Sequence, residues 1–539
     1  MKPSAQFAGR VTTISTFIIA LALATGLSGC GGGGGGSPAV TATPSATAPA
    51  TTVPAASVPA ASAPTAPVTT ASYTASQNMC AAPRSGIDPY TGKAYLDKQG
   101  KLSDEFTFLR GWIDQYYLWY KEVPNVNPLN YSTALDYFNA LKTPLLTASG
   151  QPKDKYHFTY TTAEWNALST AGVELGYGIN WSVNTGANLP RTWLATEVEP
   201  GSPAATAGVR RGDRLLTVDG ADFVNGPDQS TVDILNAGLF PAQANEIHRF
   251  TLDRSGATVS VTLTALAVTS APVKNTKAID TPTGKVGYLT FDNHNEVSER
   301  ALIDSITQLK TAGVTDLVLD VRYNGGGLLD IANELAYMIA GPAQTVGKTF
   351  EKPIYNDRFA AQPPYLFRPI AVGFNSTVAA GTILPTLNLK RVTLLTTADT
   401  CSASESIINS LRGIDVQVNL IGGQTCGKPY AFTPVDNCGT TYFSIEFQGV
   451  NNKGFGDYAD GFAPTCNVAD DLQHAVGDTS EGLLAAALAY RATGVCPAQS
   501  ATAATSTAAT MTAVSVSVPA PQRQLVRPYA AGVAVLRPR

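Results

Sequence analysis

The chain has 539 residues, of which 44% are hydrophobic and 14% charged, and its formal net charge at pH 7 is −4. This length allows roughly two to four domains with a large buried core. The slightly acidic balance argues against a nucleic-acid partner, because no basic block occurs in the body of the chain. Only the last stretch is locally basic, and we interpret it as a solvated tail; its arginines are Arg523, Arg527, Arg537 and Arg539.

Residues 1–30 are interpreted as an export signal. Lys2 and Arg10 give a positive start, and residues 11–27 are mostly apolar but too short for a convincing membrane span. The segment ends L-S-G-C at Cys30, which resembles the lipobox of bacterial lipoproteins. That resemblance implies a lipid anchor on Cys30 and a place in the bacterial cell envelope, on the outer rather than the inner membrane. An ordinary secretory signal or a single anchor helix is the alternative.

Six cysteines remain after Cys30, and an even number in an exported chain predicts three disulfides among fifteen possible connectivities. We favour Cys401–Cys426, Cys438–Cys466 and Cys80–Cys496. The spacings contain no C-x-x-C pair and no nearby histidine, so they do not fit a zinc site. We expect no metal or other cofactor.

Two low-complexity segments flank the folded part of the chain. Residues 31–79 begin with six glycines and continue in Pro, Ala, Thr and Ser, which predicts a disordered tether. Residues 497–539 have a similar composition and are expected to be a disordered tail. Between them we expect three folded segments: 80–168, 169–270 and 271–496.

The segment 80–168 is dense in aromatic residues. A stripe recurs at helical spacing, and a second helix is expected near residues 132–141; the stripe contains Phe106, Leu109, Ile113, Tyr116, Tyr117 and Tyr120. Such a stripe is more often core than cofactor pocket. We therefore expect a small helical N-terminal domain without chemistry of its own.

The segment 169–270 changes to short strands. The run S-P-A-A-T-A-G-V-R-R-G-D-R-L-L-T-V-D-G, from Ser202, resembles the PDZ domain. PDZ domains add a peptide strand to a sheet edge and hold its free carboxylate with loop N–H groups. The resemblance implies that Gly176, Tyr177, Gly178 and Ile179 form this loop and that polypeptides with exposed C-termini are partners. A purely structural packing domain is the alternative.

The segment 271–496 is predicted to be an α/β core with a mixed sheet. A strand at 286–291, an amphipathic helix at 297–309 and a buried strand at 316–321 indicate a right-handed crossover with helices on the sheet faces. This unit delivers Asp320, Arg322 and Asn324, followed by three glycines, at a strand's carboxyl end, where α/β sheets place their sites. The glycines free backbone N–H groups for an anion.

A second strand-turn-helix follows at residues 392–411. The apolar strand 392–397 breaks into a small-residue turn around Ser402, and helical spacing follows. A serine on a sharp strand-to-helix turn is typical of a nucleophile, because its hydroxyl projects from the turn. A returning strand at 418–421 then leads to Lys428.

The ordered set D-V-R-Y-N-G-G-G, S-A-S-E and G-K, downstream of a PDZ-like unit, resembles the C-terminal processing (tail-specific) serine peptidases over about residues 172–491. That resemblance implies Ser402 as nucleophile, Lys428 as general base and Glu405 as an orienting or structural acid. It implies the backbone N–H groups of Ala403 and Gly326 as oxyanion donors, with Gly325 or Gly327 as alternatives. Asp320, Arg322 and Asn324 would support this loop.

Ser–Lys pairs are a known variant of the serine hydrolase triad, provided that desolvation lowers the lysine pKa from about 10.4. Two departures from the family leave the lysine's orienting partner open: Pro429 replaces a glycine, and Phe432 replaces a common glutamine. A degenerate peptide-binding scaffold, or hydrolysis of a non-peptide ester or amide, are therefore alternative functions.

Two other site types are disfavoured. A Ser–His–Asp triad would need one of four histidines, of which His294 is best placed, but a hydrogen-bonded loop histidine is the favoured interpretation. The run G-G-Q-T-C-G-K matches the start of a phosphate-binding loop. Pro429 stands where that loop needs Ser or Thr, so we expect no nucleotide.

Overall fold

The computed structural model describes residues 70–183, 189–374, 377–498 and 533–535. The predicted export signal, with Cys30, and residues 31–69 of the predicted tether lie outside the described residues. Within the described residues, no helix combines the length and the apolar character that crossing a bilayer requires.

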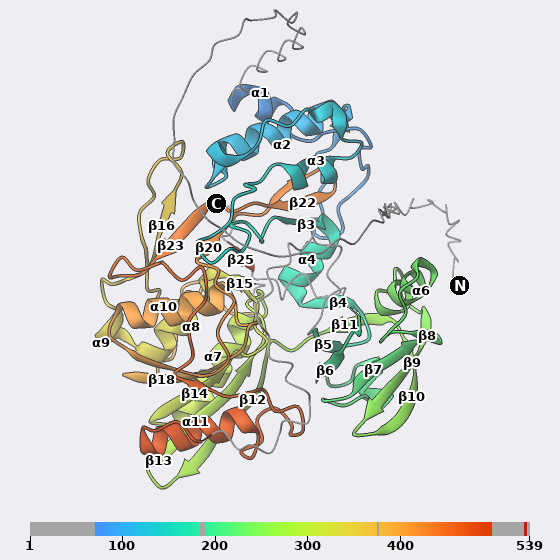
Figure 1. The fold of residues 1–539 in the computed structure, drawn as a ribbon. Helices are drawn as coiled ribbons and strands as arrows, with labels where there is room; N and C mark the ends of the chain where they lie inside the picture. The colour runs from blue at the N-terminus through green and yellow to red at the C-terminus, as the bar shows by residue number, and fades with distance from the viewer. Residues whose placement is uncertain (1–69, 184–188, 375–376, 499–532, 536–539) are drawn as a thin grey trace, which may run out of the picture. The chain divides into compact units, whose positions relative to one another are not determined.

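The core sheet follows the predicted strand–helix–strand pattern and has the order β12-β13-β14-β18-β19-β24 (Figure 1). β12 is antiparallel to β13, and the other neighbours are parallel, so the sheet is mixed as expected. The strands are β12 (Val273–Thr281), β13 (Gly284–Phe291), β14 (Asp316–Asp320), β18 (Arg391–Thr396), β19 (Gln417–Gly422) and β24 (Cys466–Asn467).

Both faces of this sheet are covered, which explains the continuous apolar strands. Leu317 and Leu319 of β14 belong to the core beneath α7 (Ser298–Thr311), α8 (Leu329–Ala340) and α10 (Ala403–Gly413). Val318, between them, packs on the other face with Leu483 of α11 (Gly482–Thr493). The alternation places the carboxyl ends of β14 and β18 between two packed layers.

Two smaller sheets accompany the core sheet, and one of them joins the N-terminal segment to the core. One has the order β21-β22-β3 and the other β17-β16-β23-β20. The strands are β3 (Phe158–Thr161), β16 (Thr349–Tyr355), β17 (Tyr365–Leu366), β20 (Tyr430–Ala431), β21 (Val435–Asn437), β22 (Thr440–Phe443) and β23 (Phe447–Val450). Because β3 pairs with β22, the N-terminal segment and the core share one hydrophobic cluster.

The aromatic stripe of the N-terminal segment is core, as predicted. Phe106, Leu109 and Ile113 are buried on α2, which ends at Tyr116. Folded structure begins before residue 80, which corrects the predicted tether: Tyr73 is buried against α2. The elements are α1 (Thr70–Ala75), β1 (Met79–Cys80), β2 (Lys98–Gln99), α2 (Leu102–Tyr116), two 3-10 turns (Tyr120–Glu122 and Pro128–Asn130), α3 (Ala134–Ala140) and α4 (Thr162–Ala171).

The PDZ-like segment forms an antiparallel sheet of order β10-β9-β7-β6-β5, with β8 paired to β7. A separate two-stranded sheet pairs β4 with β11, the first and last strands of this segment. The elements are β4 (Val173–Gly176), β5 (Ile179–Val183), β6 (Trp193–Val198), α5 (Pro203–Thr206), β7 (Arg214–Val218), β8 (Ala221–Asp222), α6 (Gln229–Leu239), β9 (Ile247–Arg254), β10 (Ala257–Thr264) and β11 (Leu266–Thr269). Trp193, Phe223 and Phe250 form a core separate from that of the main sheet.

Three disulfides form: Cys80–Cys438, Cys401–Cys426 and Cys466–Cys496. The predicted Cys401–Cys426 pair is confirmed, and the predicted Cys438–Cys466 and Cys80–Cys496 pairs are wrong. Residues next to Cys80 dock on the β21–β22 turn, where the Asn78 N–H donates to Asn437 Oδ1 at 2.7 Å. Cys466 lies on edge strand β24, and α11, packed over that end of the sheet, delivers Cys496 to it.

The remaining elements lie near the loop that follows β14. They are β15 (Gly326–Leu328), α9 (Pro342–Thr345) and β25 (Val533–Val535). β25 pairs in parallel with β15. The disorder predicted for residues 497–539 therefore does not extend to these three residues, whose backbone finds an open strand edge.

Candidate active site

Ser402 opens α10 in a strained backbone conformation. Its φ is +59° and its ψ is −111°, a region that residues with a Cβ avoid. The side chain is completely buried, and its Oγ makes no hydrogen bond within the part of the chain that the structure describes. The predicted sharp strand-to-helix turn is present, whereas a hydrogen bond between Ser402 Oγ and Lys428 Nζ is not formed.

Glu405, one helical turn after Ser402, joins the serine and lysine segments. Its Oε2 accepts from the N–H groups of Ser402 (2.9 Å) and Lys428 (2.8 Å). Its Oε1 accepts from the Gly427 N–H (2.9 Å) and the Thr425 hydroxyl (2.5 Å). Burial raises the pKa of Glu405, and these four donors oppose that effect. One buried carboxylate therefore fixes both backbones that the sequence predicts to meet.

The same two segments are tied by the Cys401–Cys426 disulfide, whose Cα atoms lie 5.1 Å apart. The sulfurs and a Glu405 oxygen lie close enough together to resemble a metal cluster. Both sulfurs are used in the disulfide, however, so neither is available as a thiolate ligand. The cluster is a brace rather than a metal site.

The Lys428 side chain lies between two aromatic rings. Its Nζ is 3.9 Å from the ring centroid of Phe432 and 4.9 Å from that of Tyr156. Burial lowers the pKa of Lys428 well below that of an exposed lysine, although the carboxylates of Asp154 and Glu405 act in the opposite direction. Phe432, which occupies the position of a common family glutamine, is thus one wall of the lysine pocket.

The other wall comes from the N-terminal segment, to which the sequence assigned no chemistry. The Tyr156 hydroxyl donates to Gly427 O (3.1 Å), and Lys155 Nζ donates to Cys426 O (3.3 Å). Asp154 is buried behind them and accepts from the Tyr117 hydroxyl at 2.6 Å. The only trace in the sequence is a charged run, D-K-Y-H, within an aromatic segment.

The glycine before the lysine is required by space. An ideal Cβ at Gly427, whose φ is +81°, would lie 2.2 Å from the Ala459 carbonyl oxygen. Any side chain there would push the lysine segment away from its neighbour. The G-K pair is therefore a packing requirement as well as a sequence motif.

The loop after β14 is fixed by a buried ion cluster. Arg322 binds Asp320 (2.8 Å) and Glu481 (2.7 Å), and all three side chains are inaccessible. Tyr323, next in the chain, accepts a hydrogen bond from Arg211 of the PDZ-like segment at 2.6 Å. The predicted supporting roles of Asp320 and Arg322 thus correspond to a rigid anchor, in which Glu481 and Arg211 were not predicted.

Asn324 carries this loop to the serine. Its backbone carbonyl accepts from the Cys401 N–H (3.0 Å) and from the Ser404 hydroxyl (3.1 Å). Its side-chain Oδ1 accepts from the Gly326 N–H at 2.9 Å. The Gly326 N–H is therefore already occupied here, and Gly325 and Gly327 stand as the alternative donors.

His294 packs under this loop and does not approach the serine by any hydrogen bond. Its Nδ1 lies 3.0 Å from Asn324 Oδ1, and burial lowers the pKa of His294 to about 3. The ring is therefore neutral at physiological pH. It matches the interpretation of a hydrogen-bonded loop histidine.

The predicted carboxylate-binding loop, Gly176–Ile179, is partly buried in the PDZ-like core and partly at the edge of its sheet. Tyr177 is buried in the PDZ-like core, and its hydroxyl donates to Gly238 O at 2.8 Å. Gly178, with φ +77°, packs against Ser202, and its carbonyl accepts from the Glu199 N–H at 2.8 Å. Ile179 begins β5, an outer strand of the sheet, which leaves one edge of β5 without a strand partner among the described residues.

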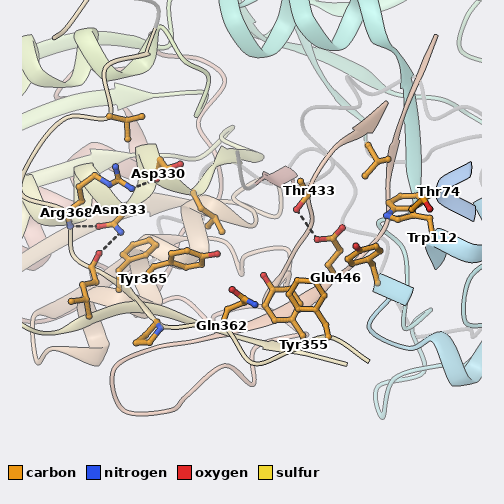
Figure 2. Close-up of a pocket in the computed structure, with 18 of the residues that line it drawn as sticks. Thr74, Trp112, Asp330, Asn333, Tyr355, Gln362, Tyr365, Arg368, Thr433 and Glu446 are labelled. Atoms are coloured by element: carbon orange, nitrogen blue, oxygen red, sulfur yellow. Dashed lines mark hydrogen bonds and ion pairs between the residues drawn. The ribbon is translucent and has the colours of Figure 1, made fainter. Parts of the chain in front are cut away.

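One cleft has a volume of about 930 Å³, and neither Ser402 nor Lys428 lines it. Trp112 of α2 and Asp330 of α8 line two of its sides. Figure 2 shows the Arg368–Asp330 ion pair and the hydrogen bond from Thr433 to Glu446 on its walls. Burial raises the pKa of Glu446 to about 8, so this carboxyl is largely protonated at neutral pH.

Family comparisons identify the three segments. Residues 285–460 match peptidase family S41, residues 194–237 match the PDZ domain, and residues 106–160 match the peptidase S41 N-terminal domain. The chain belongs to peptidase family S41. The S41 chain thus has the α/β core, PDZ domain and N-terminal domain that the sequence predicts, and the C-terminal processing resemblance is confirmed.

Named relatives support this assignment. A carboxyl-terminal-processing protease of Picosynechococcus sp. is 28% identical over 225 residues, 40% of this chain and 50% of the relative. A chloroplastic C-terminal processing peptidase of Tetradesmus obliquus is 30% identical over 186 residues, 32% of this chain and 38% of the relative. The S41 chain thus spans about half or less of the curated relatives it matches.

A crystal structure from Bacteroides fragilis, assigned to the S41 proteases, shares the fold with a TM-score of 0.55 at 23% identity. The match covers 72% of this chain and 97% of that one. At this identity the likeness concerns the fold alone.

Proposed function

We propose that this S41 chain is a serine endopeptidase that cleaves polypeptides with a Ser402–Lys428 dyad. The observation that carries the proposal is the shared carboxylate: Glu405 Oε2 accepts from the backbone N–H groups of both residues. The brace of Cys401–Cys426 and the lowered pKa of a fully buried Lys428 support it. A neutral amine is what a general base requires.

The reaction follows from these roles. Ser402 Oγ bonds to the scissile carbonyl carbon while its proton passes to Lys428 Nζ. Collapse of the tetrahedral intermediate breaks the C–N bond, and Lys428 returns the proton to the leaving amine. A water then attacks the acyl-serine and gives a proton to Lys428; the second collapse breaks the bond between the acyl carbon and Ser402 Oγ, which takes that proton back from Lys428 as the acid product leaves. The dyad hydrogen bond would tighten only when substrate is present.

The developing oxyanion would accept hydrogen bonds from backbone N–H groups at the start of α10 and in the glycine loop, residues 325–327. Ala403 N–H belongs to the first turn of α10, where backbone N–H groups point outward. From the loop, Gly326 serves only if its bond to Asn324 opens, and Gly327 serves only when its N–H is not paired with β25, so Gly325 is the simpler second donor. The Asp320–Arg322–Glu481 cluster would keep this loop rigid during the reaction.

The PDZ domain would select substrates by their exposed C-terminal ends. The outer edge of β5 and the loop Gly176–Ile179 are the elements that such binding would use. A peptide library with free or amidated C-termini tests this. Preference for free carboxylates supports the proposal, and equal cleavage of both would remove it.

The protein would act in the bacterial cell envelope, held to the outer membrane by a lipid on Cys30. The L-S-G-C sequence supports this. Metabolic labelling with a fatty acid should mark the wild-type chain and not Cys30→Ser. A labelled Cys30→Ser variant, or an unlabelled wild type, would refute the anchor.

The decisive test of the activity uses matched variants. Wild-type protein should digest an unfolded protein such as reduced casein, and Ser402→Ala and Lys428→Ala should each lower kcat by at least about a thousandfold. Ser410→Ala, in the same helix, should keep most activity, because among the described residues the Ser410 hydroxyl bonds only to Ile407 O of that helix. Equal digestion by the wild type and both dyad variants would refute the proposal.

A peptide-binding scaffold without turnover is the second candidate. The absence of the Ser402–Lys428 hydrogen bond in the described structure favours it. A fluorophosphonate probe separates the two functions, because it labels an activated serine irrespective of substrate. Labelling that requires both Ser402 and Lys428 excludes the scaffold.

A further inference from the structure

Three residues near the C-terminus form a strand beside the glycine loop. β25 pairs in parallel with β15, with Val533 opposite Gly326, Ala534 opposite Gly327 and Val535 opposite Leu328. The two strands form a sheet of their own (Figure 1). The chain's own C-terminal segment therefore lies along the loop proposed to hold the oxyanion.

The geometry of β15 shows why this edge is open to an extended peptide. On its other edge, the His294 N–H donates to Gly326 O (3.2 Å) and the Leu328 N–H donates to His294 O (2.8 Å). Successive residues of a strand direct their backbone groups to alternate edges. Gly327, between these two, therefore directs its N–H and C=O toward β25. An ideal Cβ at Gly327 would lie 2.6 Å from His294 O, so only glycine fits.

The pair of strands β15 and β25 also lies between the segments that contain Ser402 and Lys428. β15 continues the loop whose Asn324 carbonyl accepts from the Cys401 N–H, next to Ser402. On the opposite side β25 contacts β20, which begins two residues after Lys428. A polypeptide substrate that presents its carbonyl to Ser402 has to pass between these same elements.

We propose that the β15 edge is the binding site for the substrate strand, and that residues 533–535 occupy it as an intramolecular competitor. The intact chain is then partly inhibited, and substrate or removal of the tail relieves the inhibition. This proposal rests on the proposed peptidase function. It assigns the edge to an extended peptide, such as Val533–Ala534–Val535.

The competitor has the sequence and the reach that the role requires. Valine favours extended backbone, and pairing along a strand edge needs no particular side chain. Residues 499–532 connect the competitor to the core, and a chain of this length, with a maximum reach of about 3.3–3.6 Å per residue, is long enough for β25 to reach β15. A linker of this kind gives a local concentration on the order of 1 mM.

The first experiment measures activity. Truncation after residue 532 should raise kcat/KM on casein about tenfold, the ratio of a 1 mM local concentration to a binding constant on the order of 0.1 mM. Val535→Pro should act alike, because in this register the Val535 N–H is the donor that faces the Gly327 carbonyl, and proline lacks it. Ala530→Pro, in the same tail but before the strand, is the matched control and should leave the activity unchanged.

The second experiment does not depend on catalysis. In the Ser402→Ala background, hydrogen exchange at Gly327 should be slow in the full chain and at least tenfold faster after truncation. A labelled peptide with the sequence of residues 532–539 should bind the truncated chain and bind the full chain more weakly. Unchanged exchange and equal binding would overturn the proposal even if the enzyme proves active.

The outcomes are separable. If no variant digests protein but exchange and peptide binding behave as expected, the peptidase function fails and tail docking stands. If the wild type is active and truncation or Val535→Pro leaves kcat/KM unchanged, the competitor is refuted. Mass spectrometry of the intact chain completes the test, because rapid loss of residues after 532 would show a substrate rather than a lasting inhibitor.

Discussion

Replacing Glu405 by glutamine tests the idea that one carboxylate aligns the dyad. Glutamine has the same shape but one acceptor oxygen. Both carboxylate oxygens are in use, each with two donors: Ser402 and Lys428 on Oε2, Gly427 and Thr425 on Oε1. Neither orientation of the amide can therefore satisfy all four donors.

The better orientation places the amide NH₂ against Thr425, whose hydroxyl can turn to accept. The Gly427 N–H then loses its acceptor and faces another donor. A lost hydrogen bond to a charged acceptor costs about 1.5–3 kcal/mol, so with the added repulsion we expect Glu405→Gln to lower the free energy of unfolding by about 2–4 kcal/mol. A shift of the lysine segment by about 1 Å would lower kcat/KM on the order of a hundredfold.

The variant should also change the pH dependence. The Glu405 carboxylate raises the pKa of Lys428, since it stabilises the ammonium form. Removing that charge lowers the pKa of Lys428 further, and the neutral base forms at lower pH. The rising limb of the kcat/KM profile, measured on a fluorogenic peptide, should therefore move to lower pH.

Glu164→Gln is the matched control. Glu164 also caps a helix from its third position, but both of its bonds from Thr161 go to one oxygen, Oε2. A glutamine can keep both, so the urea midpoint and the activity should not change. If Glu405→Gln behaves like Glu164→Gln in stability and in pH profile, the carboxylate does not align the dyad.

Two further predictions concern the surroundings of the dyad. Replacing Cys401 and Cys426 by serine should lower the free energy of unfolding by about 2–4 kcal/mol and remove most of the activity. The same change at Cys466 and Cys496, which close a loop of similar length, should cost similar stability but little activity. Equal losses of activity in the two double variants, assayed without urea, would contradict a role of the Cys401–Cys426 disulfide in bracing the dyad. Phe432→Leu removes a ring face that favours the ammonium form by about 0.5–2 kcal/mol, so the rising pH limb should move down by about 0.4–1.5 units, and an upward shift would contradict this.

The fold and the order of the site motifs could be predicted from the sequence because both depend on local patterns. The strand 392–397, the turn at Ser402 and the helix after it appear in one stretch, and the structure has β18, the turn and α10 there. Glycines 325–327 likewise mark a tight loop. Period and turn chemistry are short-range properties, so they can be recognised without knowing what packs against them.

The lysine pocket could not be found this way. Tyr156 contacts Gly427, which is 271 positions away in the sequence. Phe432 forms the opposite wall of the lysine pocket, but in the sequence it is recognisable only as a departure from the family glutamine. Two of the three predicted disulfide pairs failed for the same reason, because connectivity depends on which turns dock together. The strand at Val533–Val535 lies in a segment whose composition predicts disorder, since three residues pair only when an edge is presented to them.

The backbone of Ser402 yields the last prediction. Its φ of +59° and ψ of −111° cost on the order of 1–3 kcal/mol for any residue with a Cβ, whereas glycine adopts such angles freely. Ser402→Gly and Ser402→Ala are both expected to be inactive, so their stabilities can be compared without regard to catalysis. Glycine loses about 0.5–1 kcal/mol through chain entropy, which leaves Ser402→Gly more stable than Ser402→Ala by about 0.5–2 kcal/mol.

The relative stability of the glycine and alanine variants should reverse at Ser404, two residues further along the chain. Ser404 lies within α10 in helical backbone, where glycine is about 1 kcal/mol less stable than alanine. Urea unfolding of the four variants measures both differences. If Ser402→Gly is no more stable than Ser402→Ala, the turn is not strained. If it is more stable while Ser404→Gly is less, the fold holds its serine in an unfavourable conformation, and the Glu405 hydrogen bonds and the Cys401–Cys426 brace are what keep it there.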